Sequence, residues 1–195
     1  MRTDYIKPQS YARLFFRMQY PNVLALRLSL ETGLRIDDVL SLRPEQLTGT
    51  KLSYVAKKTG KPGKKNVSST LAKEIRRQAG KDWLFPGRSP GKHRTRQAVW
   101  RDVKQAARAL GLSENVAPHS ARKTYAVQLR KEEGVAAVQK ELQHSHGDTT
   151  MLYAFADMVT KTGAVPGTIS QDPEILAELI AEKVVEKLWK RWGKP

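Results

Sequence analysis

The sequence predicts a mainly α-helical fold with a small antiparallel β-hairpin or three-stranded sheet, which is an α+β class. Apolar residues recur at helical spacing along most of the chain, whereas short alternating stretches occur only between residues 51 and 68. A length of 195 residues with 39% hydrophobic residues is enough for one domain with a proper core. We expect this domain to span residues 1–157, with a linker and an amphipathic helix in residues 158–195.

The first predicted helices precede the sheet. Residues 21–31 contain four leucines, one valine and one alanine, begin with a proline and are followed by a stop at Gly33. A second, short helix is expected after Arg35, with Asp37 and Asp38 in its first turn, where the helix dipole favours acidic residues. Arg35 therefore lies at a junction between two helices.

The sheet and the later helices follow from changes of pattern. Residues 52–55 and 66–68 alternate around a turn rich in Lys, Gly and Pro, which indicates a hairpin. Residues 83–86 form a short hydrophobic docking segment. Further helices are expected at residues 69–78 with Ser69 as the cap, at 95–110 with Gly111 as the stop, at 118–133, and from 135 to 142. A last helix after Pro173 has an apolar stripe that needs a partner surface.

The charge of the chain points to a polyanionic partner. There are 35 Lys and Arg against 19 Asp and Glu, a formal net charge of +16, and cations placed on phosphates release condensed counterions. We therefore expect double-stranded DNA as the partner. No segment approaches a transmembrane span, so no membrane partner is expected and the chain should be cytoplasmic. Cysteine is absent and the four histidines form no HExxH pattern, which makes a metal or other cofactor unexpected.

Two arginines and a tyrosine are the strongest candidates for chemistry. Arg35 ends Thr32-Gly33-Leu34-Arg35, and Arg122 ends His119-Ser120-Ala121-Arg122. Guanidinium groups can neutralise a phosphate without a metal because they are always ionised and their fork matches two oxygens. A single arginine in so basic a chain is usually a solvated surface residue, and a lone tyrosine is usually a core residue. The order and spacing of the motifs therefore decide the interpretation.

In this order and spacing the motifs resemble the tyrosine recombinases, the family that includes phage integrases. The third motif runs from Leu142 through His144 to Tyr153, and the resemblance covers roughly residues 24–155. It implies the catalytic-domain fold of that family. It further implies DNA cleavage and rejoining through a 3′-phosphotyrosyl intermediate on Tyr153, without metal or ATP, with Arg35 and Arg122 as the phosphate clamp.

The resemblance also assigns the histidines. His119 is similar to the family's acid–base partner of the nucleophile, and His144 to its hydrogen-bond donor to the phosphate, although His146 is a rival for His144. Either one, taken alone, is compatible with a structural histidine. His93 is expected at the surface or on the DNA backbone.

A lysine on the hairpin turn is implied as the proton donor to the leaving 5′ oxygen. Lys58, in Lys57-Lys58-Thr59-Gly60, fits the Lys-Thr-Gly form of some phage integrases, and Lys57 is the immediate alternative. Asp38 stands where the family often has a carboxylate that buttresses the active site. A first-turn residue favoured only by the helix dipole is an equal alternative for Asp38.

One geometric condition and two departures accompany the resemblance. His144 and Tyr153 are nine residues apart and would lie on opposite faces of an unbroken helix, so we expect a chain break near Gly147. Gln143 replaces a common glycine, and Lys123 stands where many relatives have a histidine.

Few residues precede the first motif helix, whereas family members typically carry an N-terminal core-binding domain. This chain is therefore expected to be either the catalytic half of a longer protein or a minimal recombinase of bacterial, phage or plasmid origin. Dimers or tetramers on DNA are expected. Two alternative functions remain open, a non-cleaving DNA-binding module and a type IB topoisomerase.

Overall fold

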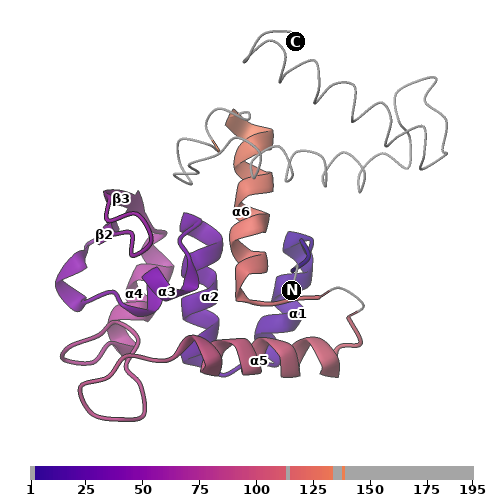
Figure 1. Cartoon of the computed structure of the whole chain (residues 1–195), viewed down its shortest axis with the longest axis horizontal. Helices are drawn as coiled ribbons and strands as arrows, with labels where there is room; N and C mark the ends of the chain where they lie inside the picture. Colours follow the sequence, from indigo (N-terminus) through magenta and orange to yellow (C-terminus); the bar gives the residue numbers. More distant parts are fainter. Residues whose placement is uncertain (1–2, 113–114, 134–137, 139–195) are drawn as a thin grey trace, which may run out of the picture. The chain divides into compact units, whose positions relative to one another are not determined.

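The structure, a computed structural model, describes residues 3–112, 115–133 and 138 (Figure 1). Its elements, in chain order, are the helices and strands α1 (Pro8–Phe16), α2 (Tyr20–Thr32), α3 (Ile36–Leu40), the 3₁₀ turn η1 (Pro44–Gln46), β1 (Leu47–Thr48), β2 (Lys51–Val55), β3 (Pro62–Asn66), α4 (Ser69–Gln78), α5 (Arg96–Ala109) and α6 (Pro118–Glu133). The predicted class, mainly α with a small antiparallel sheet, is confirmed.

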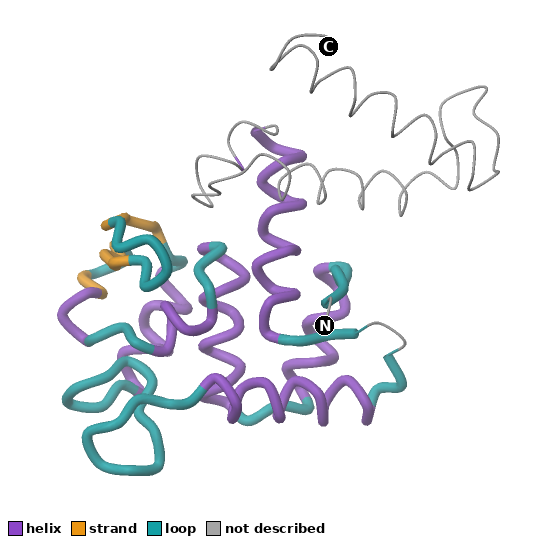
Figure 2. The backbone as a smooth tube through the Cα atoms, viewed as in Figure 1, coloured by secondary structure: helices purple, strands orange, loops and turns teal. Residues whose placement is uncertain are grey.

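Helix α2 lies at the centre of the helical layer. It packs against α3, α4, α5 and α6, while α1 packs against α5. Its leucines 24, 26 and 28 are all buried, and so are the polar side chains of Asn22, Ser29 and Thr32. A helix that is buried on every side needs apolar residues all round, which explains the leucine-rich stretch in the sequence. Figure 2 shows the strands gathered on one side of the helices.

The sheet has the strand order β1-β2-β3, and both pairs are antiparallel. Leu52 and Tyr54 point into the core, and the alternate residues Lys51, Ser53 and Val55 point to solvent. Tyr54 pairs with Gly63, and a Cβ added at Gly63 would lie 2.5 Å from Cζ of the Tyr54 ring. Only glycine at this position leaves room for the ring.

The last strand differs from the prediction, which placed it at residues 66–68. The observed β3 has no large apolar residue, so its position is set by pairing with β2. Val67, the apolar residue on which the prediction relied, is buried just after the strand.

Two further differences concern the helices. The cap of α4 is Ser68 and not Ser69, because the Ser68 hydroxyl accepts a hydrogen bond from the Leu71 N–H (3.4 Å) and itself donates to Glu31 (2.7 Å). Helix α1 was not predicted. The docking segment at residues 83–86 is confirmed, since Leu84 and Phe85 are fully buried.

Several predictions fall outside the described residues. These are the helix at 135–142, the chain break near Gly147, the domain boundary at residue 157 and the C-terminal helix. Among the helices that the structure does describe, none has the length and apolar character needed to cross a membrane.

Candidate active site

Arg35 is held at a braced turn between α2 and α3. Helix α2 ends at Gly33, whose φ of 70° is the left-handed conformation that favours glycine, and the Gly33 N–H donates to the Ser29 carbonyl at 2.9 Å. The Ser29 hydroxyl donates to the Leu34 carbonyl at 2.7 Å, and the Leu34 side chain is buried. Arg35 follows as the N-cap residue of α3. The prediction that it lies at a helix junction is confirmed.

Arg122 reaches the same turn from α6. Its side chain is buried, with 5% of the residue exposed, and its guanidinium donates a hydrogen bond to the Gly33 carbonyl. This carbonyl lies two residues before Arg35 in the chain. A buried arginine that is hydrogen-bonded to fixed backbone has little freedom to reorient. The two predicted clamp residues are therefore positioned by one shared structural element.

His119 precedes Arg122 by three residues on α6 and lies in the same positive surroundings. Partial burial lowers the pKa of His119 to about 4, and Arg122, Lys123 and Arg35 add to this shift because like charges disfavour the protonated ring. The His119 residue is nevertheless exposed to solvent. At neutral pH its ring is neutral and has a nitrogen lone pair that can accept a proton.

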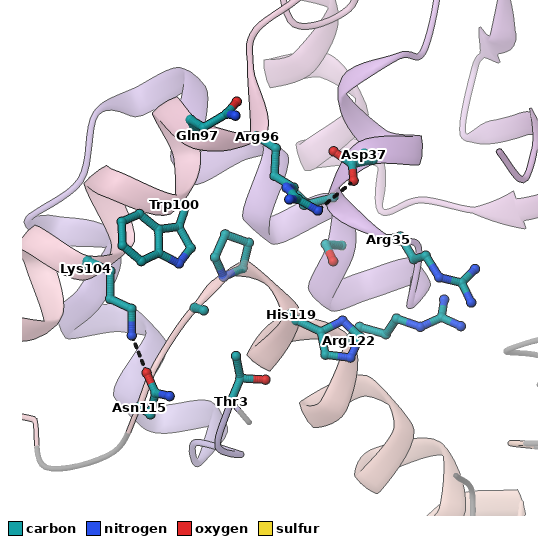
Figure 3. A pocket seen from close by; sticks show the side chains of 14 residues that line it. Thr3, Arg35, Asp37, Arg96, Gln97, Trp100, Lys104, Asn115, His119 and Arg122 are labelled. Carbon is teal, nitrogen blue, oxygen red and sulfur yellow. Dashed lines mark hydrogen bonds and ion pairs between the residues drawn. The ribbon is translucent and has the colours of Figure 1, made fainter. Parts of the chain in front are cut away.

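These three residues line one cleft of about 520 Å³ (Figure 3). In Figure 3 the guanidinium groups of Arg35 and Arg122 extend in the same direction, with the His119 ring beside Arg122. Two cations and one neutral imidazole thus face one cavity. An arrangement of this kind can hold a phosphate and withdraw a proton from a nucleophile next to it.

The wall of the cleft opposite α6 is formed by α5, and sequence reasoning missed it. Arg96, Trp100 and Lys104 line the cleft at helical spacing, and Arg96 contacts the carboxylate of Asp37 at 3.4 Å. Trp100 is 44% exposed. The apolar spacing of this helix already placed Trp100 outside the core. A tryptophan on the polar side of an amphipathic helix is unusual, and this was the sequence signal that could have indicated a functional surface on α5.

The hairpin lysines occupy a different environment. Lys57 and Lys58 are both exposed, in a turn closed by a hydrogen bond from the Ala56 N–H to the Lys61 carbonyl at 2.9 Å. Lys58 is not among the residues that line the cleft of Arg35. Of the predicted site residues, the structure thus brings together Arg35, His119 and Arg122 and leaves Lys58 at the surface.

Asp38 connects the hairpin to the arginine turn. It is 4% exposed, and its Oδ1 accepts a hydrogen bond from the Lys57 N–H at 2.9 Å. Asp38 also lies three residues after Arg35. Of the two alternatives for Asp38, the contact supports the buttress, because a residue favoured only by the helix dipole has no need to be buried against the hairpin.

A second hairpin lysine contacts α6 directly. The Lys65 Nζ lies 3.5 Å from the Tyr125 hydroxyl and 5.3 Å from the centre of its ring. Tyr125 is three residues beyond Arg122 on α6. Strand β3 is therefore tied to the helix that carries the clamp, a contact that the sequence did not predict.

The N-terminal segment covers another side of the cleft. Lys123 donates to the Thr3 carbonyl, Thr124 donates to the Ile6 carbonyl at 3.0 Å, and Thr3 itself lines the cleft. Lys123, one of the departures from the family pattern, thus fixes this segment beside His119.

The remaining candidate residues are three histidines and the predicted nucleophile, Tyr153. His93 is half-buried, with Nδ1 2.8 Å from the Arg94 carbonyl and its ring edge-on to Trp83, so it is more enclosed than the predicted surface position. His144, His146 and Tyr153 lie outside the described residues.

Comparison with known proteins identifies the family of the chain. The model of the phage integrase family matches residues 5–159. The chain belongs to this family. It is 30% identical over 138 residues to the tyrosine recombinase XerD of Lacticaseibacillus casei, covering 65% of this chain and 47% of that protein. It is 27% identical over 154 residues to the integrase of Escherichia phage P2, covering 78% of this chain and 43% of that protein.

The fold is that of the family's catalytic domain. The catalytic domain of bacteriophage HP1 integrase superposes with a TM-score of 0.62 at 18% identity, covering 86% of this chain and 100% of that domain. A lambda integrase dimer bound to a COC′ core site gives a TM-score of 0.68 at 18% identity, covering 88% of this chain and 52% of that chain. The present chain spans about half the length of the curated relatives first matched.

Proposed function

We propose that this member of the phage integrase family is a site-specific DNA recombinase that cleaves and rejoins DNA strands through a 3′-phosphotyrosyl intermediate. The observation that carries the proposal is the cleft in which Arg35, His119 and Arg122 converge. The two guanidinium groups, of which that of Arg122 is held by its hydrogen bond to the Gly33 carbonyl, favour a bound phosphate. They favour its transition state more, because negative charge on the oxygens then increases.

In the cleavage step, the Tyr153 oxygen attacks the scissile phosphorus. A bond forms between this oxygen and phosphorus, and the bond from phosphorus to the 5′ oxygen breaks. Neutral His119 accepts the tyrosine proton, and His144 donates a hydrogen bond to a phosphate oxygen. The family resemblance supports the roles of Tyr153, His144 and His119, and the position of His119 beside Arg122 in the cleft agrees with its role.

The leaving 5′ oxygen takes its proton from Lys58, with Lys57 as the alternative. Rejoining reverses the step, since a 5′ hydroxyl attacks the phosphotyrosine and releases Tyr153. Because the phosphodiester energy is kept in the tyrosyl link, rejoining needs no ATP. The guanidinium groups of Arg35 and Arg122 neutralise the phosphate in place of a metal.

We further propose that the substrate is double-stranded DNA bound by two or four copies of the protein. The net charge of +16 supports DNA as the partner. The solved lambda integrase structures with a similar fold are a dimer bound to a core site and a tetramer bound to a Holliday junction.

A suicide duplex, nicked close to the cleavage position so that the released strand diffuses away, tests the proposal. Wild-type protein should form a covalent adduct that resists detergent, and Tyr153→Phe should abolish it. Tyr20→Phe is the matched control and should retain the adduct, because Tyr20 is an exposed residue whose hydroxyl contacts Glu74.

Since the target sequence is not encoded in this chain, the duplexes should come from the DNA that flanks the gene. Absence of an adduct on all of them, with binding retained, would instead favour a non-cleaving module. Relaxation of any plasmid by monomers would favour a topoisomerase.

A further inference from the structure

A second basic cleft lies on another face of α5. It has a volume of about 360 Å³ and is bounded by the loop of residues 87–94, the start of α2 and the α5 side chains Ala98, Arg101, Asp102 and Gln105. The first cleft uses Arg96, Gln97, Trp100 and Lys104 of the same helix. At 100° per residue, the mean directions of these two sets of side chains around the α5 axis are about 135° apart. One phosphate cannot occupy both clefts.

The second cleft is strongly positive. Four cations line it, Arg88, Lys92, Arg94 and Arg101, against the single carboxylate of Asp102. This carboxylate already accepts hydrogen bonds from the Gln19 N–H at 2.9 Å and from the Asn22 amide at 2.6 Å. None of the four cations forms an ion pair within the described residues. The cleft therefore has an excess of positive charge that the described part of the protein does not neutralise.

Arg94 is the fixed member of this group. It is half-buried, and its Nη1 donates to the Asn22 side-chain oxygen at 3.1 Å, while its buried Nε has no hydrogen-bond partner in the described part of the chain. Burial lowers the pKa of Arg94, Asp102 opposes this shift, and Arg88 adds to it. A guanidinium that has lost hydration without gaining a carboxylate is stabilised by an added anion.

The loop that carries three of the cations is closed at its base. The Gly87 N–H donates to the Lys92 carbonyl at 2.8 Å, and the Arg94 N–H donates to the Phe85 carbonyl at 2.8 Å. A Cβ at Gly87 would lie 2.8 Å from the His93 carbonyl oxygen, so only glycine lets the two arms approach this closely. The cations are thus presented by a preformed loop, which reduces the entropy lost on binding.

We propose that this second cleft binds a backbone phosphate of the substrate DNA other than the scissile one. The proposal rests on the proposed function, because it takes the DNA that occupies the first cleft as its ligand. Arginine and lysine side chains that contact phosphates fix the position of a protein on the duplex without reading its sequence. The second cleft would set the register in which the scissile phosphate enters the first.

A charge-removal experiment with two substrates tests this site. The variant Arg88→Ala/Lys92→Ala/Arg101→Ala removes three exposed cations and leaves Arg94 in place. Its matched control, Arg17→Ala/Lys73→Ala/Arg77→Ala, removes three exposed cations that do not line the cleft. DNA affinity is measured by fluorescence anisotropy over a range of salt concentrations. For one lost phosphate contact, the slope of log K against log salt should fall by about 0.9 in the cleft variant. The control should keep the wild-type slope.

A scan with neutral methylphosphonates then identifies the phosphate. Each duplex carries one methylphosphonate, and the affinity loss is compared between wild type and cleft variant. We expect one position, away from the scissile phosphate, to weaken the wild type about tenfold and the cleft variant hardly at all, because the partner charges are already gone. At the scissile position both proteins should lose affinity equally.

The inference is overturned if every methylphosphonate weakens the cleft variant as much as the wild type, or if the control variant loses the same slope. A failure of the proposed function would look different. Wild-type protein would then form no adduct on the suicide duplex, whatever the phosphate scan shows.

Discussion

The arginine turn and the lysine hairpin serve the same proposed reaction but are built in different ways. Arg122 is buried and bonded to the Gly33 carbonyl, and Arg35 follows a turn braced by Ser29. Lys58 is exposed in a turn whose backbone is held on both sides of it, by the hydrogen bond from the Lys57 N–H to Asp38 and by the one from the Thr59 N–H to the Ala56 carbonyl.

This difference matches the two chemical tasks. A charge that develops on phosphate oxygens is stabilised best by dipoles and cations that are already in place, since no reorganisation is then needed. A proton donor needs only to reach one oxygen as its bond breaks. We therefore expect changes in the arginine turn to affect both fold and chemistry, and changes in the hairpin to affect chemistry alone.

Replacing Arg122 should have the largest combined effect, because it should lower both the rate of cleavage and the stability of the protein. Arg122→Ala removes a phosphate contact and leaves the Gly33 carbonyl without its partner, so cleavage of the suicide duplex should slow by about 10²–10³-fold or more. Stability should also fall, by roughly 1–3 kcal/mol in urea unfolding. Arg77→Ala, an exposed arginine on α4, should change neither quantity. If Arg122→Ala is as stable as the wild type, the hydrogen bond from Arg122 to the Gly33 carbonyl does not contribute to the stability of the fold as proposed.

Replacing Lys58 should slow chemistry without destabilising the protein. Lys58→Ala should reduce single-turnover cleavage by about 10²–10⁴-fold and leave the urea midpoint unchanged, because the side chain is exposed. A substrate with sulfur in place of the leaving 5′ oxygen should restore the rate, because a thiolate leaves without being protonated. Lys57→Ala is the matched variant. If Lys57→Ala, and not Lys58→Ala, slows cleavage and is restored by the sulfur-containing substrate, Lys57 is the proton donor.

Replacing Asp38 should have an intermediate effect on the hairpin. Asp38→Ala removes a charge-assisted hydrogen bond to the Lys57 N–H, which is worth roughly 1.5–3 kcal/mol. Cleavage should slow by about 10–100-fold, and hydrogen exchange of the Lys57 amide should accelerate. Asp82→Ala, at an exposed position, should alter neither. Faster cleavage by Asp38→Ala would contradict this prediction, because it would mean that the hydrogen bond between Asp38 and the Lys57 N–H slows the reaction.

The smallest effect concerns pH and His119. Its folded-state pKa of about 4 lies below the ordinary value of 6.5, so the unfolded chain binds more protons between these values. Stability should therefore decrease as pH falls from 6.5 towards 4, and His119→Gln should remove part of this decrease when urea unfolding is compared at pH 7 and pH 5. Cleavage should show no titration of His119 between pH 6 and 8. A rate that falls from pH 8 to pH 6 and becomes flat in His119→Gln would contradict the low pKa.

Sequence reasoning located the arginine turn well because local rules determine it. Apolar spacing followed by Gly33 predicts a helix end, and the first-turn acids after Arg35 predict a helix start. The bounds of α6 follow in the same way from Pro118 and its periodicity. These signals act over a few residues and need no tertiary information.

The features that were missed depend on contacts between distant residues. Strand β3 is placed by pairing with β2 and by the space that Gly63 leaves for Tyr54, neither of which its own Lys- and Gly-rich sequence reveals. The contact of Asp38 with Lys57 bridges 19 residues, and that of Arg122 with Gly33 bridges 89. A pattern can nominate such residues but cannot say which atoms meet.

The turn at Gly33 also determines where the chain tolerates changes of length. The Gly33 carbonyl accepts a hydrogen bond from Arg122, and only Leu34 separates Gly33 from Arg35. The length of this backbone segment therefore sets the position of Arg35 relative to Arg122. One inserted residue would turn Arg35 by about 100° if the helix simply extended. Insertions between Gly33 and Arg35 should therefore be rejected, whereas the exposed positions Lys81 and Asp82, which line neither cleft, offer a place where the length of the chain can vary.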